Sequence, residues 1–120
     1  MHLEGNFYKI DSFTQKEENN YSFVVTILPG HSIYEGHFPE QPVVPGVCTL
    51  TIIRECISRI LEKEISFATI KECKYISALI PEENLSVAID ITFTDTTKVK
   101  VQAERADNGQ AVLKLRAEIR

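Results

Sequence analysis

The sequence predicts an α+β fold, in which residues 1–120 form a single domain with one curved antiparallel sheet wrapped around one long central helix. Three observations support this prediction. The chain has 120 residues, 43% of them hydrophobic, which is enough for one core and too few for two ordinary domains. One segment carries apolar residues at helical spacing, and most of the other apolar segments alternate as half-buried strands do.

Two strands are expected ahead of the helix. Residues 21–28 (YSFVVTIL) are dense in aromatic and β-branched side chains and are followed by Pro29 and Gly30, which predicts a strand that ends in a turn. Residues 7–13 form a weaker candidate for an earlier strand.

The long helix is predicted to run from Pro45 and Gly46 to about Lys63, because this segment contains no further proline or glycine. Its first half is apolar almost all round and should be buried, whereas charged residues make its second half amphipathic. The apolar residues at helical spacing are Val47, Leu50, Ile53, Ile57, Ile60 and Leu61.

The C-terminal third is predicted to be an antiparallel meander. Residues 85–94, 98–106 and 111–119 each alternate apolar and polar side chains, and residues 107–109 (DNG) tolerate the positive φ of a hairpin turn. Residues 66–79 form a less regular strand. A pair of strands, then a long buried helix, then further antiparallel strands is the order of the hot-dog fold.

Composition and charge exclude several classes of function. The net charge is -4 and the two signs are mixed along the chain, so no nucleic-acid partner is expected. Three cysteines without C-x-x-C spacing indicate a reducing, cytoplasmic location. The sequence contains no cluster of metal-ligating residues and no glycine-rich phosphate loop, so neither a metal nor an organic cofactor is expected. No segment has the length and apolar character of a membrane span, so none is expected.

Residues 36–47 (GHFPEQPVVPGV) are the segment most suited to chemistry. Their prolines stiffen a loop that presents His37 close to the start of the predicted helix. At that start, the backbone N–H groups of Gly46 and Val47 have no partner within the helix and carry partial positive charge. A histidine beside such donors is suited to removing a proton next to a thioester carbonyl while the N–H groups stabilise the developing charge.

This segment closely resembles the signature of the 3-hydroxyacyl-[acyl carrier protein] dehydratases, which are hot-dog enzymes of fatty-acid biosynthesis. The resemblance implies lyase activity, with His37 as the catalytic base, Gly46 as a thioester-binding backbone group, and Gly36, Phe38 and Pro39 in the substrate loop. It also implies an acyl carrier protein or coenzyme A thioester as substrate, in fatty-acid or related lipid or polyene synthesis. The oligomer implied is a homodimer or a multiple of one.

One position departs from the resemblance. The family places a Glu or Asp on the buried helix as the second catalytic group, and here that position is Thr51. A threonine hydroxyl is not a general acid near neutral pH, although it can hydrogen-bond a substrate or a water. Glu55, one helical turn further on, replaces the missing carboxylate only if the pocket has shifted. Three functions therefore stay open: a dehydratase, a thioesterase, and a non-catalytic acyl-binding subunit that partners an active dehydratase.

Overall fold

The structure, a computed structural model, describes residues 2–29, 43–82 and 84–120. Within these ranges it contains one long helix and six strands, in the predicted order. The elements are β1 (Tyr8–Glu17), β2 (Asn20–Ile27), α1 (Gly46–Leu61), β3 (Phe67–Tyr75), β4 (Leu85–Asp95), β5 (Lys98–Arg105) and β6 (Ala111–Ile119).

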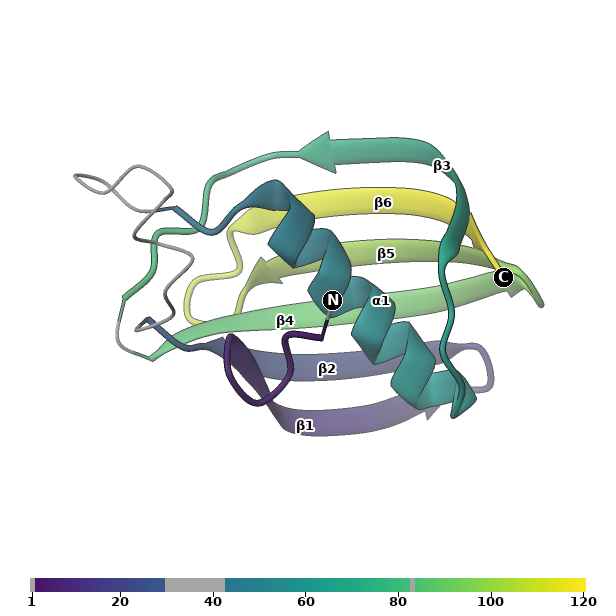
Figure 1. The fold of residues 1–120 in the computed structure, drawn as a ribbon, viewed down its shortest axis with the longest axis horizontal. Helices are drawn as coiled ribbons and strands as arrows, with labels where there is room; N and C mark the ends of the chain where they lie inside the picture. The colour runs from purple at the N-terminus through teal and green to yellow at the C-terminus, as the bar shows by residue number, and fades with distance from the viewer. Residues whose placement is uncertain (1, 30–42, 83) are drawn as a thin grey trace.

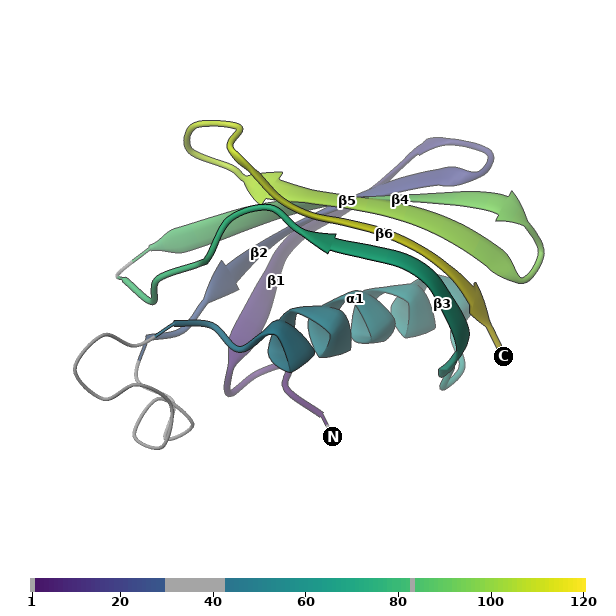
Figure 2. The ribbon, with the colours of Figure 1, turned by 90° about the horizontal axis from the view of Figure 1, so that it is seen from above.

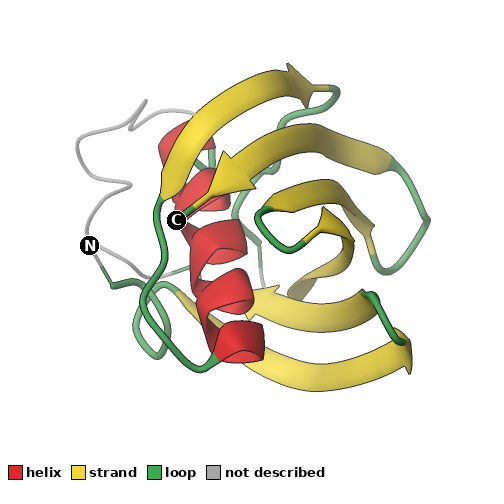
Figure 3. Cartoon of the chain, turned by 90° about the vertical axis from the view of Figure 1, so that its right-hand side faces the viewer, coloured by secondary structure: helices red, strands yellow, loops and turns green. Residues whose placement is uncertain are grey.

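The strands form one antiparallel sheet in the order β1-β2-β4-β5-β6-β3. The predicted meander of β4, β5 and β6 is confirmed, and Gly109 in its last turn has a φ of +71°. β3 leaves the end of the helix and pairs with β6 at the far edge of the sheet (Figure 1). The sheet curves around α1, which lies along its concave side (Figures 2 and 3).

Alternation along the strands builds the core. In β4, Leu85, Val87, Ile89 and Ile91 are buried, and their polar neighbours lie on the other face. β5 and β6 repeat the pattern, so their inward side chains meet the helix. The helix contributes its own buried apolar residues, namely Cys48, Ile52, Ile53, Cys56 and Ile57.

The ends of the helix differ slightly from the prediction. The helix stops at Leu61, because Glu62 adopts a left-handed conformation with a φ of 56° and its N–H caps the carbonyl of Ser58. The expectation that the first half is buried is wrong for Val47, which is 60% exposed among the described residues. Gly46 and Leu50 in the same half are only half-buried.

The N-terminal residues lie on the outer side of the helix, away from the sheet (Figure 2). Leu3 and Phe7 are buried, and the backbone N–H of Phe7 donates to the carbonyl of Leu3 in a tight turn that leads into β1. β1 runs on to Glu17, further than its apolar residues predicted. It is an edge strand whose later residues are exposed, so it needs no apolar face there.

Candidate functional site

Four predicted site residues, Gly36, His37, Phe38 and Pro39, lie outside the described residues. The predicted catalytic base and its substrate loop therefore stay predictions. The structure does describe the other half of the predicted site, which is the start of α1 and the segments packed around it.

A groove with a volume of about 410 Å³ opens at the start of α1. It lies between the first turn of the helix, the end of β3 and the segment that follows β3. Most of its lining is apolar, and its residues are Val44, Gly46, Thr49, Tyr75, Ile76, Ser77, Ala78, Leu79 and Val112. A hydrogen bond of 2.8 Å from the N–H of Val44 to the carbonyl of Leu79 ties two of its walls together.

The first helical turn supplies hydrogen-bond donors at this groove. Pro45 precedes the helix in an extended conformation, and its carbonyl accepts bonds from the N–H groups of Cys48 (2.9 Å) and Thr49 (3.3 Å). The N–H groups of Gly46 and Val47 have no acceptor among the described residues. No acidic side chain lies in the first turn, so the partial positive charge of the helix start is left uncompensated there. A polarised carbonyl oxygen is a suitable partner for these donors.

Tyr75, at the end of β3, packs directly on Gly46. Its hydroxyl donates to the Gly46 carbonyl over 3.1 Å, and a Cβ atom at position 46 would lie 2.9 Å from the ring. Glycine is therefore the residue that lets the ring approach the helix start so closely. Partial burial, together with the neighbouring Cys73, raises the pKa of Tyr75 to about 12, so the phenol remains a neutral hydrogen-bond donor.

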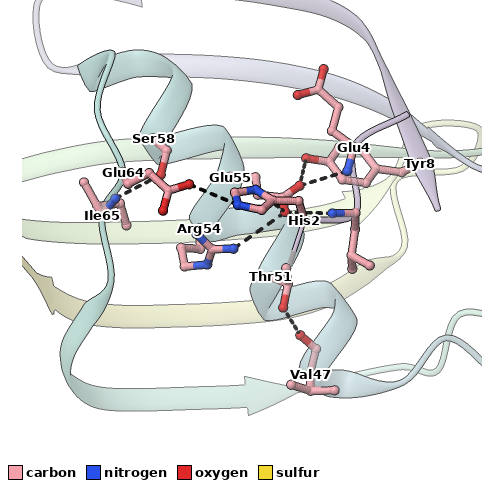
Figure 4. A network of polar contacts seen from close by, with 11 residues as sticks. His2, Glu4, Tyr8, Val47, Thr51, Arg54, Glu55, Ser58, Glu64 and Ile65 are labelled. Carbon is pink, nitrogen blue, oxygen red and sulfur yellow. Dashed lines mark hydrogen bonds and ion pairs between the residues drawn. The ribbon is translucent and has the colours of Figure 1, made fainter. Parts of the chain in front are cut away.

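Thr51, at the position of the expected acid, is buried and its hydroxyl is already bonded. Its Oγ1 donates to the carbonyl of Val47, one turn earlier in the helix, over 2.8 Å (Figure 4). Threonine inside a helix commonly makes this bond, which satisfies the hydroxyl locally. Thr51 does not line the groove.

Glu55 holds the N-terminal turn against the helix. Its carboxylate accepts hydrogen bonds from the N–H of Leu3 (2.8 Å), the N–H of Glu4 (3.0 Å) and the hydroxyl of Tyr8 (2.8 Å) (Figure 4). Its side chain is 8% exposed, and a guanidinium nitrogen of Arg54 lies 3.6 Å away. Burial and the Glu55 carboxylate raise the pKa of Tyr8 well above its usual range, so the phenol stays a donor. Glu55 does not line the groove either.

The cysteines have the environment of packing residues. Cys48 and Cys56 are buried and Cys73 is half-buried, and none of them forms a disulfide. Burial raises the pKa of the Cys48 thiol, which keeps it protonated despite its place near the helix start. Among the described residues, no group of three or more His, Cys, Asp and Glu side chains could hold a metal ion. No helix in the same ranges is long and apolar enough to cross a membrane.

Sequence reasoning did not single out Thr49 or Tyr75 as site residues. Thr49 follows Gly46 by three positions and so shares its side of the helix, a signal that was present in the sequence. Tyr75 comes from a distant strand, and only the pairing of β3 with β6 at the sheet edge brings it to the helix start.

The fold and the groove at the helix start define a hot-dog protein. A family model described as ApeI-like, ApeI dehydratase, matches residues 13–115. The chain therefore belongs to the ApeI-like dehydratase family.

The chain is also similar to individual curated proteins and, in its fold, to solved structures. The chain is 27% identical over 94 residues to the 3-hydroxyacyl-[acyl-carrier-protein] dehydratase FabZ of Bacillus velezensis. This alignment covers 72% of this chain and 67% of that protein. The dehydratase heterocomplex ApeI:P from Xenorhabdus doucetiae has a similar fold, with a TM-score of 0.77 at 18% identity over 92% of this chain and 95% of that one. A hypothetical thioesterase with coenzyme A from Streptococcus pneumoniae matches with a TM-score of 0.60 at 12% identity, over 93% and 83% of the two chains.

Proposed function

We propose that this protein binds 3-hydroxyacyl thioesters in the groove at the start of α1 and takes part in their dehydration. The observation that carries the proposal is the unpartnered N–H group of Gly46 at an otherwise mostly apolar groove, with the unpartnered N–H group of Val47 next to it in the first turn of α1. This combination suits a thioester carbonyl attached to an acyl chain. Membership of a dehydratase family points to the same substrate class.

In the proposed reaction, the thioester oxygen accepts hydrogen bonds from the Gly46 and Val47 N–H groups. His37 removes a proton from the carbon next to the carbonyl, and the electron pair forms a double bond to the next carbon as the hydroxyl leaves. That hydroxyl needs a proton to depart as water. A positioned acid usually contributes about 10²–10⁴-fold to such a step.

The described part of this chain offers no acid at the groove. The lining contains no Asp, Glu or His, Thr51 uses its hydroxyl on Val47, and the Glu55 carboxylate is occupied by the N-terminal turn. We therefore assign Glu55 a structural role and expect the chain alone to be a slow dehydratase. The substrate is proposed to be carried on acyl carrier protein or coenzyme A.

A second candidate is an acyl-binding subunit that is completed by a different, acid-bearing hot-dog chain. Thr51 favours this candidate, since the helix lacks the family's carboxylate. The similar ApeI of Xenorhabdus doucetiae is itself part of a dehydratase heterocomplex. Thioester hydrolysis is less well supported, because the groove holds no carboxylate to activate a water.

An assay of the purified protein with 3-hydroxyacyl thioesters tests the proposal. We expect slow formation of the 2,3-unsaturated thioester, followed by its absorbance, and loss of this activity in His37→Ala. Binding of acyl thioesters without turnover would favour the second candidate. Release of free thiol from a saturated acyl thioester would instead show that the protein is a thioesterase.

A further inference from the structure

Thr49 is one of the two buried polar residues among those that the structure describes, the other being Thr51. Thr49 is 7% exposed, and its Oγ1 forms no hydrogen bond with any residue in the part of the chain that the structure describes. A buried hydroxyl without a partner is unfavourable, so such groups in folded proteins commonly have a role that the protein alone does not show. Thr49 also lines the groove at the start of α1.

Thr51, two residues further along α1, differs from Thr49 in the hydrogen bonding of its hydroxyl and in its position relative to the groove. Thr51 is buried to a similar degree, at 8% exposed, but its hydroxyl donates to the Val47 carbonyl over 2.8 Å and it does not line the groove. Thr51 occupies the position where the sequence led us to expect a group that contacts substrate. Among the described residues that line the groove, Tyr75 and Ser77 use their hydroxyls on backbone carbonyls, and Thr49 has a hydroxyl that forms no hydrogen bond.

The distance between Thr49 and the start of α1 is similar to the distance between the carbonyl and the 3-hydroxyl oxygen of a 3-hydroxyacyl thioester. Thr49 follows Gly46 by three residues, which corresponds to about 4.5 Å along the helix axis. In a 3-hydroxyacyl thioester, the carbonyl oxygen and the 3-hydroxyl oxygen are separated by about 3–4.5 Å, as bond lengths near 1.5 Å require. A carbonyl held by the Gly46 N–H therefore leaves the 3-hydroxyl within reach of the first helical turn.

We propose that the Thr49 hydroxyl binds the 3-hydroxyl group of the acyl thioester and so makes the groove selective for hydroxylated over saturated acyl chains. This inference rests on the proposed function, which places an acyl thioester in the groove. Thr49 acts as a specificity-determining residue. A saturated acyl chain leaves the buried Thr49 hydroxyl without a partner, and that loss is the physical basis of the selectivity.

The test uses the full chain and two unreactive ligands, 3-hydroxyoctanoyl-pantetheine amide and octanoyl-pantetheine amide, in titration calorimetry. We expect the wild type to bind the hydroxylated ligand about tenfold more tightly, the ratio that one net hydrogen bond supplies. Thr49→Val has nearly the same shape without the hydroxyl, and it should lose this ratio while keeping the affinity for the octanoyl ligand. Thr49→Ser should keep the ratio. The unfolding midpoint of each variant confirms that it is folded.

Thr51→Val is the matched control, because it removes a hydroxyl that is already bonded within the helix, and it should keep the wild-type ratio. The inference is overturned if Thr49→Val retains the ratio, if Thr51→Val loses it, or if the wild type binds both ligands equally. The last result would leave the proposed function standing, since acyl ligands would still bind. Failure of the wild type to bind either ligand would overturn the proposed function and this inference with it.

Discussion

Thr51 and Thr49 lie two positions apart on α1, and their hydroxyls have different surroundings. The Thr51 hydroxyl bonds the Val47 carbonyl, while the Thr49 hydroxyl lies at the groove. A bonded hydroxyl has little left to offer a substrate. Position 51 also lacks the carboxyl group that the resemblance to the dehydratases leads us to expect there, and the effect of this difference can be tested directly.

Thr51→Glu is expected to raise the rate of 3-hydroxyacyl thioester dehydration by at least about tenfold, which corresponds to about 1.4 kcal/mol of transition-state stabilisation. The reason is that position 51 does not line the groove of its own chain, so a glutamic acid there is expected to reach into the groove of the partner subunit of a dimer, as the resemblance to the dehydratases implies, and to protonate the departing hydroxyl, which threonine cannot do. Steady-state kinetics with a 3-hydroxyacyl thioester would measure the change. Thr51→Gln is the control, because glutamine has nearly the same shape as glutamic acid but no acidic proton. Its dehydration rate should stay at the wild-type value. An equal gain in both variants would contradict this explanation.

Glu55 has a structural role that can be measured as stability. We expect Glu55→Gln to lower the free energy of unfolding by about 2–3 kcal/mol, because an amide offers one acceptor oxygen where the carboxylate now accepts three hydrogen bonds. Urea unfolding gives this value. Tyr8→Phe removes one of the three bonds, and a double-mutant cycle should show that the two changes are not additive. A dehydration rate that fell with Glu55→Gln at unchanged folding would instead support a catalytic carboxylate.

At the scale of elements, the site depends on the contact between the start of α1 and the end of β3. Tyr75 bonds the Gly46 carbonyl and fills the space where a side chain at position 46 would stand. This contact fixes one wall of the groove. It links two residues that are 29 positions apart in the sequence.

Gly46→Ala is expected to cost about 1 kcal/mol of unfolding free energy, because the new Cβ displaces the Tyr75 ring and breaks its hydrogen bond. The cost stays small because the ring is 52% exposed and can move outward. In a Tyr75→Ala background the same change should be neutral or slightly stabilising, since alanine is the better helix former. Urea unfolding of the four proteins measures this coupling. An equal cost in both backgrounds would show that the contact does not matter.

In the whole molecule, most residues of both edge strands, β1 and β3, are exposed. The two edges differ in where large apolar side chains are exposed. Five of the six large apolar side chains that the described residues expose lie at the start of α1, in β3 or in the segment after it. They are Val47, Ile70, Tyr75, Ile76 and Ile80, and the sixth is Phe13 on β1. Exposed apolar side chains on an edge strand favour association with another chain.

We therefore expect a homodimer, or a multiple of one, that forms through the β3 edge. Ile70→Lys should shift the protein toward monomer in sedimentation velocity, because burying a charge at an interface is costly. Phe13→Lys is the matched control, since Phe13 on the opposite edge is 41% exposed and Ile70 is 43% exposed. A wild type that sediments as a monomer at micromolar concentration would contradict the expectation.

Local patterns in the amino-acid sequence were sufficient to predict the elements of this fold. Period-two alternation in residues 85–94, 98–106 and 111–119, and helical spacing after Pro45, are local consequences of how backbone geometry exposes side chains. They predicted the helix and the strands, together with the hot-dog order. The sequence also predicted that the start of the helix offers free N–H groups, because capping depends on immediate neighbours.

The three-dimensional structure was needed to see which side chains share the groove and which form hydrogen bonds elsewhere. It placed β3 beside β6, brought Tyr75 onto Gly46, and turned the Glu55 carboxylate to the N-terminal turn. It also separated Thr49 from Thr51, two residues that look alike in the sequence. The physical reason is that hydrogen-bond partners and burial depend on contacts between distant segments, which local spacing does not specify.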